Sequence, residues 1–239
     1  MTDAATILRA GRARKYLVLL IALIVMLVVQ PLLGHRSVAA GAFFDGLLAM
    51  IAFFAFFIVF EKRWQRRVAL ALVLPALASN VALYVLPAPA TWASAVGYHC
   101  FLIVFLAFVV AVILRGIFSK RVIQGDDVLG AFAGYMLAAI AWGNLFALTY
   151  LLAPETFSVK PELAWRLGEW HRRRALFDYL SFTTLTSLGY SDLAPAGPPV
   201  YSLTWLEVIF GQFYIAVVVA QFVGLRLARA IQRDGPESK

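Results

Sequence analysis

Long runs of apolar residues, separated by short polar segments, dominate the chain. A helix needs roughly 20 residues to cross the hydrocarbon core of a bilayer, and six runs approach or exceed that length. In lipid a helix satisfies its own backbone donors and acceptors, and runs this continuous do not fit barrel strands. We therefore predict an all-α membrane protein with six transmembrane helices, at Tyr16 to Leu33, Val38 to Phe60, Val68 to Leu86, Val96 to Leu114, Val128 to Leu152 and Val200 to Leu225.

The composition agrees with this pattern and argues against several functions. The 239 residues are 62% hydrophobic and only 14% charged, which is too apolar for a soluble domain. The formal charge is +8, but the basic residues cluster at the ends of the apolar runs, so we expect no nucleic-acid partner. His35, His99 and His171 are scattered, and without a paired nucleophile and base we expect no enzyme. Cys100 stands alone and cannot form an intrachain disulfide.

The positions of the basic residues predict the orientation. They precede the first run and follow the second, fourth and sixth: Arg9, Arg12, Arg14, Lys15; Lys62, Arg63, Arg66, Arg67; Arg115, Lys120, Arg121; Arg226, Arg229, Arg233. Such alternate segments belong to the cytoplasmic side, so we expect a multi-pass protein of the cell membrane, bacterial inner membrane, with both termini cytoplasmic. The basic start also fits a signal peptide, but the first run exceeds the usual length of about 7 to 15 residues, so we expect this span to be retained.

The segment between the fifth and sixth runs has a different character. A charged stretch, Glu155 to Arg174, precedes an apolar part of about a dozen residues, Ala175 to Thr186, which is too short to span and predicts a re-entrant helix. Such a half-helix points the negative end of its dipole toward the membrane centre and favours cations over anions. Gly189 then supplies the freedom that the backbone needs to aim successive carbonyls at an axis.

The residues Thr186-Ser-Leu-Gly-Tyr-Ser-Asp192 resemble the signature filter of potassium channels, Thr-Thr-Val-Gly-Tyr-Gly-Asp. The resemblance covers about Val128 to Leu225 and is to small bacterial ion channels with this pore at the C-terminus. It implies a homotetramer in the bilayer, because the filter is a ring of four such loops, with permeant potassium ions and no other cofactor. It also implies that Thr186 ends the pore helix, that Asp192 lies at the outer mouth, and that potassium is coordinated at Ser187, Leu188, Gly189 and Tyr190.

Three positions depart from that signature. Ser191 replaces the second glycine, whose usual backbone conformation costs a residue with a Cβ roughly 1 to 2 kcal/mol. Potassium selectivity is still expected, and this is the position at which it would be relaxed. Ser187 keeps the hydroxyl that threonine would provide. Leu188 replaces valine, and its side chain is expected to face the pore helix. We expect these last two changes to be mild.

The sixth run is expected to line the conduction path. Gly211 lies 19 residues after Asp192, the spacing at which the resembling channels carry a glycine hinge; close helix packing through a small residue is the alternative. The same register places four side chains toward the cavity or its cytoplasmic exit: Gln212, Ile215, Val219 and Val223. An interhelical hydrogen bond is the alternative for Gln212.

Glu207 lies inside the sixth run, where ionisable groups usually face protein or water. We expect its carboxyl group to support the filter from behind by bonding the hydroxyl of Ser181 or Thr184. Direct ion binding is the less favoured interpretation of this residue.

The first four runs, residues 16–114, are expected to form a peripheral module. Voltage-sensing spans carry several arginines, whereas Val96 to Leu114 has no Arg or Lys, so we predict no voltage sensor. Asp45, Asn80 and His99 are candidates for a buried polar network; a pH-sensing His99 is less favoured. The other predicted divisions are an N-terminal segment, a linker, the pore module and a tail too short for a fused ligand-binding domain: 1–15, 115–127, 128–225 and 226–239.

Two alternatives to a potassium-selective or potassium-preferring channel stay open. The first is a weakly selective monovalent cation channel, which would follow if Ser191 disturbs the outer filter. The second is a non-conducting membrane scaffold or a secondary transporter. Transporters often have matched broken helices in two inverted repeats, whereas only one re-entrant segment is predicted here.

Overall fold

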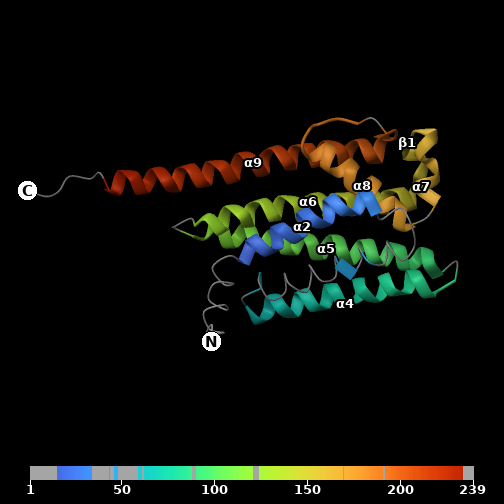
Figure 1. The fold of residues 1–239 in the computed structure, drawn as a ribbon, viewed down its shortest axis with the longest axis horizontal. Coiled ribbons are helices and arrows are strands. Elements are labelled where there is room, and N and C mark those ends of the chain that lie inside the picture. Colours follow the sequence, from blue (N-terminus) through green and yellow to red (C-terminus); the bar gives the residue numbers. More distant parts are fainter. Residues whose placement is uncertain are drawn as a thin grey trace, which may run out of the picture.

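The structure is a computed structural model. It describes residues 15–33, 43, 46–47, 59–60, 62–87, 90–120, 124–168, 170–190 and 192–233. These residues are mostly helical, and Figure 1 shows the long helices running side by side. The elements are α2 (Lys15–Leu33), α4 (Arg63–Val85), α5 (Ala90–Phe118), α6 (Gly125–Leu152), η1 (Pro154–Thr156), β1 (Phe157–Val159), η2 (Pro161–Leu163), α7 (Ala164–Gly168), α8 (Trp170–Leu185), β2 (Leu193–Pro195) and α9 (Pro198–Arg233).

Four of the described helices, α4, α5, α6 and α9, are long and apolar enough to cross a membrane. The prediction of an all-α membrane protein is therefore confirmed at this level. Helix α2 coincides with the expected first span, but its apolar stretch, Tyr16–Gln30, is shorter than the other four. The expected second span, Val38 to Phe60, lies almost entirely outside the described residues. The total of six spans thus stays a prediction.

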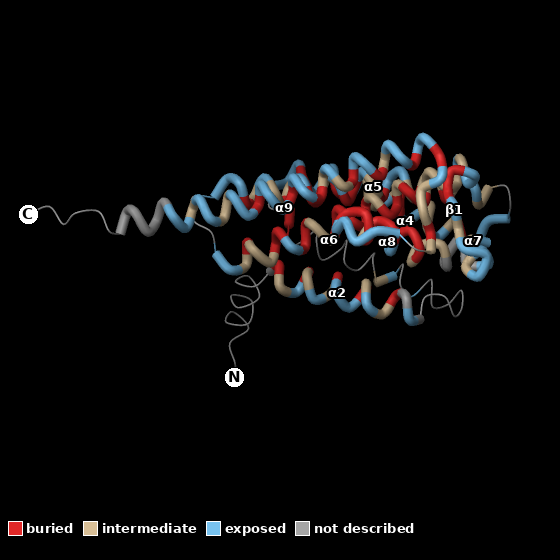
Figure 2. Tube along the Cα trace, turned by 90° about the horizontal axis from the view of Figure 1, so that it is seen from above, coloured by how far each residue is buried: buried red, intermediate tan, exposed pale blue. Residues whose placement is uncertain are grey.

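Helix α6 forms the centre of the bundle. It packs against α5, α2, α8 and α9, while α4 packs on the far side of α5. Figure 2 shows buried residues concentrated in α5, α6 and α8, with exposed residues along most of α9. Small residues permit this close packing: a Cβ at Gly134 would lie 2.6 Å from the Tyr214 hydroxyl oxygen, and one at Gly143 would lie 2.7 Å from Oδ1 of Asp178.

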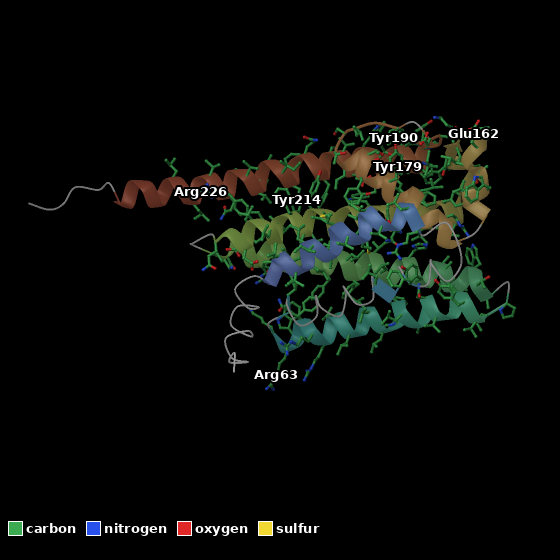
Figure 3. All side chains as sticks on the ribbon, in the orientation of Figure 1. Arg63, Glu162, Tyr179, Tyr190, Tyr214 and Arg226 are labelled. Carbon is green, nitrogen blue, oxygen red and sulfur yellow. The ribbon has the colours of Figure 1, made fainter. Side chains whose placement is uncertain are left out.

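The basic ends of the helices gather at one end of the bundle. Figure 3 shows Arg63, at the start of α4, and Arg226, late in α9, toward this end and Glu162 toward the other. Arg63 and Arg226 thus lie at the same end of the described bundle, and the alternation of basic segments across six spans stays a prediction. The side of the membrane that this end faces stays a prediction based on its positive charge.

The polar segment between α6 and α9 has more regular structure than the sequence indicated. Strands β1 and β2 form a two-stranded antiparallel sheet in which Phe157 pairs with Pro195 and Val159 with Leu193. Helix α8 begins at Trp170, so Arg174 belongs to the re-entrant helix, not to the charged stretch before it as the sequence analysis had it. The sheet closes the segment at the end of the bundle opposite the C-terminal end of α9 (Figure 1).

Candidate functional site

Helix α8 contains most of the segment Ala175 to Thr186 that was predicted to form a re-entrant helix. Its 16 residues rise about 24 Å at 1.5 Å each, less than the roughly 30 Å of a hydrocarbon core. It packs between α6 and α9, and Phe177, Leu180 and Leu185 are buried there. The buried hydroxyls of Thr183 and Thr184 each donate to the carbonyl of Leu180, at 2.9 and 2.7 Å. These two hydroxyls are thus satisfied within the helix, which ends at Leu185.

The carbonyl oxygen of Leu185, at the end of α8, contacts both neighbouring helices. It accepts a hydrogen bond of 3.1 Å from the Tyr135 hydroxyl of α6. On the other side, a Cβ placed on Gly211 of α9 would lie only 2.5 Å from the same oxygen. Close packing therefore accounts for the glycine at position 211, and α9 continues as helix through it.

The candidate filter begins with a tight turn on the end of α8. The amide of Leu188 donates to the Thr183 carbonyl at 2.8 Å, and the amide of Gly189 lies 3.4 Å from the same oxygen. Gly189 has φ +97°, in the region that favours glycine. Ser187 also has positive φ, +58°, which is uncommon for a residue with a Cβ.

This turn corrects one expectation about the filter. Leu188 was expected to turn its side chain toward the pore helix, but 77% of it is exposed, and Thr186, Ser187 and Tyr190 are exposed as well. The physical reason is that the amides of Leu188 and Gly189 find their acceptor in Thr183 of the same chain, which folds the backbone instead of extending it. Ser191 lies outside the described residues.

The outer end of the candidate filter is fixed by the small sheet. The Lys160 amide donates to the Asp192 carbonyl at 3.0 Å, and Lys160 Nζ donates to Asp192 Oδ1 at 2.8 Å. Both side chains are accessible to solvent. The hydrogen bond to Asp192, together with the charge of that carboxylate, raises the pKa of Lys160 above its usual value. The sequence analysis placed Asp192 at the outer mouth but missed this partner, which lies 32 positions earlier.

Glu207 of α9 is fully buried against α8. Its Oε1 lies 2.5 Å from Ser181 Oγ, and the same hydroxyl lies 2.7 Å from the Ala139 carbonyl of α6. The structure thus brings together Glu207 and Ser181 and links three helices through one hydroxyl. The Thr184 hydroxyl donates to the Leu180 carbonyl at 2.7 Å and lies 3.2 Å from the Tyr190 hydroxyl oxygen, and the Thr184 side chain also interacts with the Glu207 carboxyl.

The four side chains predicted to face a conduction path are exposed on the single chain: Gln212, Ile215, Val219 and Val223. Gln212 Nε2 also donates to Ser187 Oγ at 3.2 Å, which links α9 to the turn that follows α8. Ile215 and Val219 line an apolar groove between α9 and α6, with Phe132 on the opposite wall. Exposed apolar side chains on a membrane helix face either lipid or another chain.

The polar network expected in the outer halves of the early spans has a different membership. His99 Nδ1 lies 2.9 Å from Asn144 Oδ1, and Asn144 donates to the Ile140 carbonyl at 2.7 Å. Asn80 Nδ2 is buried without a hydrogen-bond partner among the described residues, and Asp45 lies outside them. The sequence analysis missed Asn144 because it considered only the first four runs.

The described part of the chain contains no cluster of three or more His, Cys, Asp or Glu side chains that could hold a metal ion. Comparison with known proteins adds no relative: no family model, no curated protein and no solved structure matches the chain. The function of the candidate site must therefore be inferred from its own residues and their arrangement.

Proposed function

We propose that the chain supplies one quarter of a homotetrameric pore that conducts potassium ions passively across a cell membrane. The proposal depends above all on one observation: a filter-like string, Thr186 to Asp192, follows a buried helix too short to span the membrane, and Gly189 within it has φ +97°. In such a pore, carbonyl oxygens from four loops replace the hydration shell of the ion. No side-chain chemistry is required.

The surroundings of this string support the proposal. Tyr135 and Gly211 hold the end of α8 from two sides, and Lys160 binds the carboxylate of Asp192 at the end of the string. Between these supports, Thr186 to Tyr190 are exposed on a single chain. A segment that is fixed at both ends and uncovered in the middle is suited to meet copies of itself around an axis.

Assembly must also change the backbone of this segment. A ladder of carbonyls aimed at an axis requires that Leu188 and Gly189 give up the Thr183 carbonyl, their acceptor in the single chain. In the proposed tetramer, neighbouring chains cover the Leu188 side chain and ions in the pore stabilise the aligned oxygens, which otherwise repel one another. The exposed apolar face of α9, including Trp205 and Phe213, supplies the contact area.

The test is potassium flux from liposomes that contain the purified full chain. Gly189→Ala should reduce the flux about tenfold or more, because the proposed filter requires the backbone freedom of glycine at this position, and conformations with positive φ cost a residue with a Cβ roughly 1 to 2 kcal/mol. Gly168→Ala is the matched control, since a Cβ at that exposed position meets no atom within 4 Å. Equal flux from wild type and Gly189→Ala, or a monomer after chemical cross-linking in the membrane, would refute the proposal.

Selectivity is measured in the same liposomes as the reversal potential in a gradient of sodium against potassium. Replacing Ser191 with glycine should sharpen the preference for potassium, because glycine removes the conformational penalty of the Cβ. A wild-type pore that already rejects sodium as strongly as the glycine variant would contradict this account of Ser191.

A further inference from the structure

A partly open cavity lies between α2, α4 and α5 at the basic end of the bundle. It has a volume of about 240 Å³. Its apolar lining includes Tyr16, Val59 and Val112, and its polar lining includes the cations of Lys62, Arg115 and Lys120. Since one water takes about 30 Å³ of liquid, the space accommodates a phosphate group with several waters.

The cavity has more positive than negative charge around it. Lys120 pairs with the buried carboxylate of Asp127, but Lys62 and Arg115 make no ion pair in the described part of the chain. Both side chains are exposed and stand at the ends of apolar helices. Among the described residues, two cations thus line one cavity without an ion pair, while the third is held in position by the Asp127 carboxylate.

The wall of the cavity is fixed by hydrogen bonds and ring stacking. Arg66 Nε donates to the Phe60 carbonyl at 2.9 Å, and the Lys62 amide donates to Gln65 Oε1 at 3.0 Å. The Phe60 ring is fully buried and stacks on Phe108 of α5 with 5.4 Å between the centroids. The start of α4 is therefore held against α5, and its unpaired amides add positive potential near the cavity.

We infer that this cavity binds the phosphate of an anionic phospholipid from the adjacent leaflet. Lys62 and Arg115 supply the charge-assisted hydrogen bonds, and Val59 and Val112 contact the glycerol and upper acyl carbons. The position favours lipid as the source of the phosphate, because the cavity opens among the ends of spanning helices, where basic pockets meet headgroups. Trp64, half exposed beside it, has the side chain that is enriched at this depth.

A bound headgroup would join the start of α4 to the end of α5. This site lies at the end of the bundle opposite the small sheet, and it does not depend on conduction by the pore. Its test therefore uses binding and stability, which stay measurable if the proposed channel function fails.

The experiment titrates the purified full chain in neutral detergent with short-chain phosphatidylglycerol or phosphatidylcholine and follows the melting temperature. Phosphatidylglycerol should raise it at concentrations about tenfold lower than phosphatidylcholine, and high salt should weaken the effect. Arg115→Gln and Lys62→Gln should each weaken apparent binding about tenfold, the equivalent of one lost charge-assisted bond. Arg67→Gln is the matched control, because Arg67 is an exposed cation of the same helix end that does not line the cavity.

Three results would overturn the inference. If Arg67→Gln weakens binding as much as Arg115→Gln, the lipid responds to general surface charge. If phosphatidylcholine binds as tightly as phosphatidylglycerol, the cations do not select the ligand. If glycerol 3-phosphate or inorganic phosphate stabilises the protein as strongly as the lipid, the phosphate comes from solution. Far-ultraviolet circular dichroism of each variant verifies that the helices are intact.

Discussion

Replacing Gly211 with alanine separates two roles of this residue that the sequence left open. If Gly211 serves as a hinge, alanine should preserve the folded bundle or stabilise it, since alanine is the better helix former. If Gly211 serves close packing, the added methyl group meets the Leu185 carbonyl at 2.5 Å and the Leu185 side chain at 3.0 Å. The structure favours the second role and therefore predicts destabilisation.

The magnitude follows from the distance. Ordinary contacts of a Cβ begin near 3.4 Å, so α8 and α9 would have to move apart by about 1 Å or the carbonyl would have to rotate, and overpacking of this kind typically costs about 1 to 3 kcal/mol. Gly224→Ala, on the same helix, is the matched control because a Cβ there meets nothing within 4 Å. Both variants gain the same helix propensity, about 1 kcal/mol. Their difference in unfolding free energy should thus equal the packing cost.

The assay is reversible unfolding of the purified chain in mixed micelles with increasing dodecyl sulfate, followed by circular dichroism. Gly211→Ala should unfold at a lower fraction of dodecyl sulfate than wild type, and Gly224→Ala at the same or a higher one. Equal stability of the two variants would refute the packing account. A hinge would then be the better explanation for the glycine at position 211.

Two further predictions concern the polar supports of the candidate filter. Because Asp192 raises the pKa of Lys160, the stabilisation from this pair is complete below the ordinary lysine value near 10.5 and is lost as the pH rises through the raised value. Asp192→Asn should return the pKa of Lys160 toward the ordinary value in a carbon NMR titration of labelled lysine, and an unchanged midpoint would contradict the pairing. Ser181→Ala removes the hydroxyl beside Glu207 Oε1 and should cost about 1 to 3 kcal/mol in the dodecyl sulfate assay. Ser202→Ala, at an exposed hydroxyl, should change stability by less than about 0.5 kcal/mol, and equal losses would show that the buried contact contributes nothing.

The sequence predicts the existence of the long helices well because an apolar run of sufficient length is a local property. The ends of the helices are harder to predict. Helix α4 begins at Arg63, five residues before the apolar run at Val68, and α9 continues to Arg233. Charged residues with straight side chains are good helix formers and can extend their charges to the interface. The helices therefore continue beyond the ends of the apolar runs.

Features that depend on pairing between distant residues escaped prediction. Three residues, such as Phe157–Val159 of β1, are too few to show the alternation of a strand, and their partners lie beyond the whole of α8. Tyr135 looked like one aromatic residue among many, and only the fold reveals that its hydroxyl reaches the Leu185 carbonyl. The filter-like string was recognisable because its residues are contiguous, whereas the orientation of Leu188 depends on which surfaces surround it.

The sheet of β1 and β2 joins the two ends of the segment between α6 and α9. With Lys160 bonded to Asp192, the chain returns to within one strand spacing of the point where it left, so residues 161–191 form a closed loop with adjacent ends. The entropy of closing such a loop changes slowly with its length. The sheet therefore holds the end of α6 near the start of α9, and a change in the length of the turns within this loop would alter the entropy of closing it only slightly.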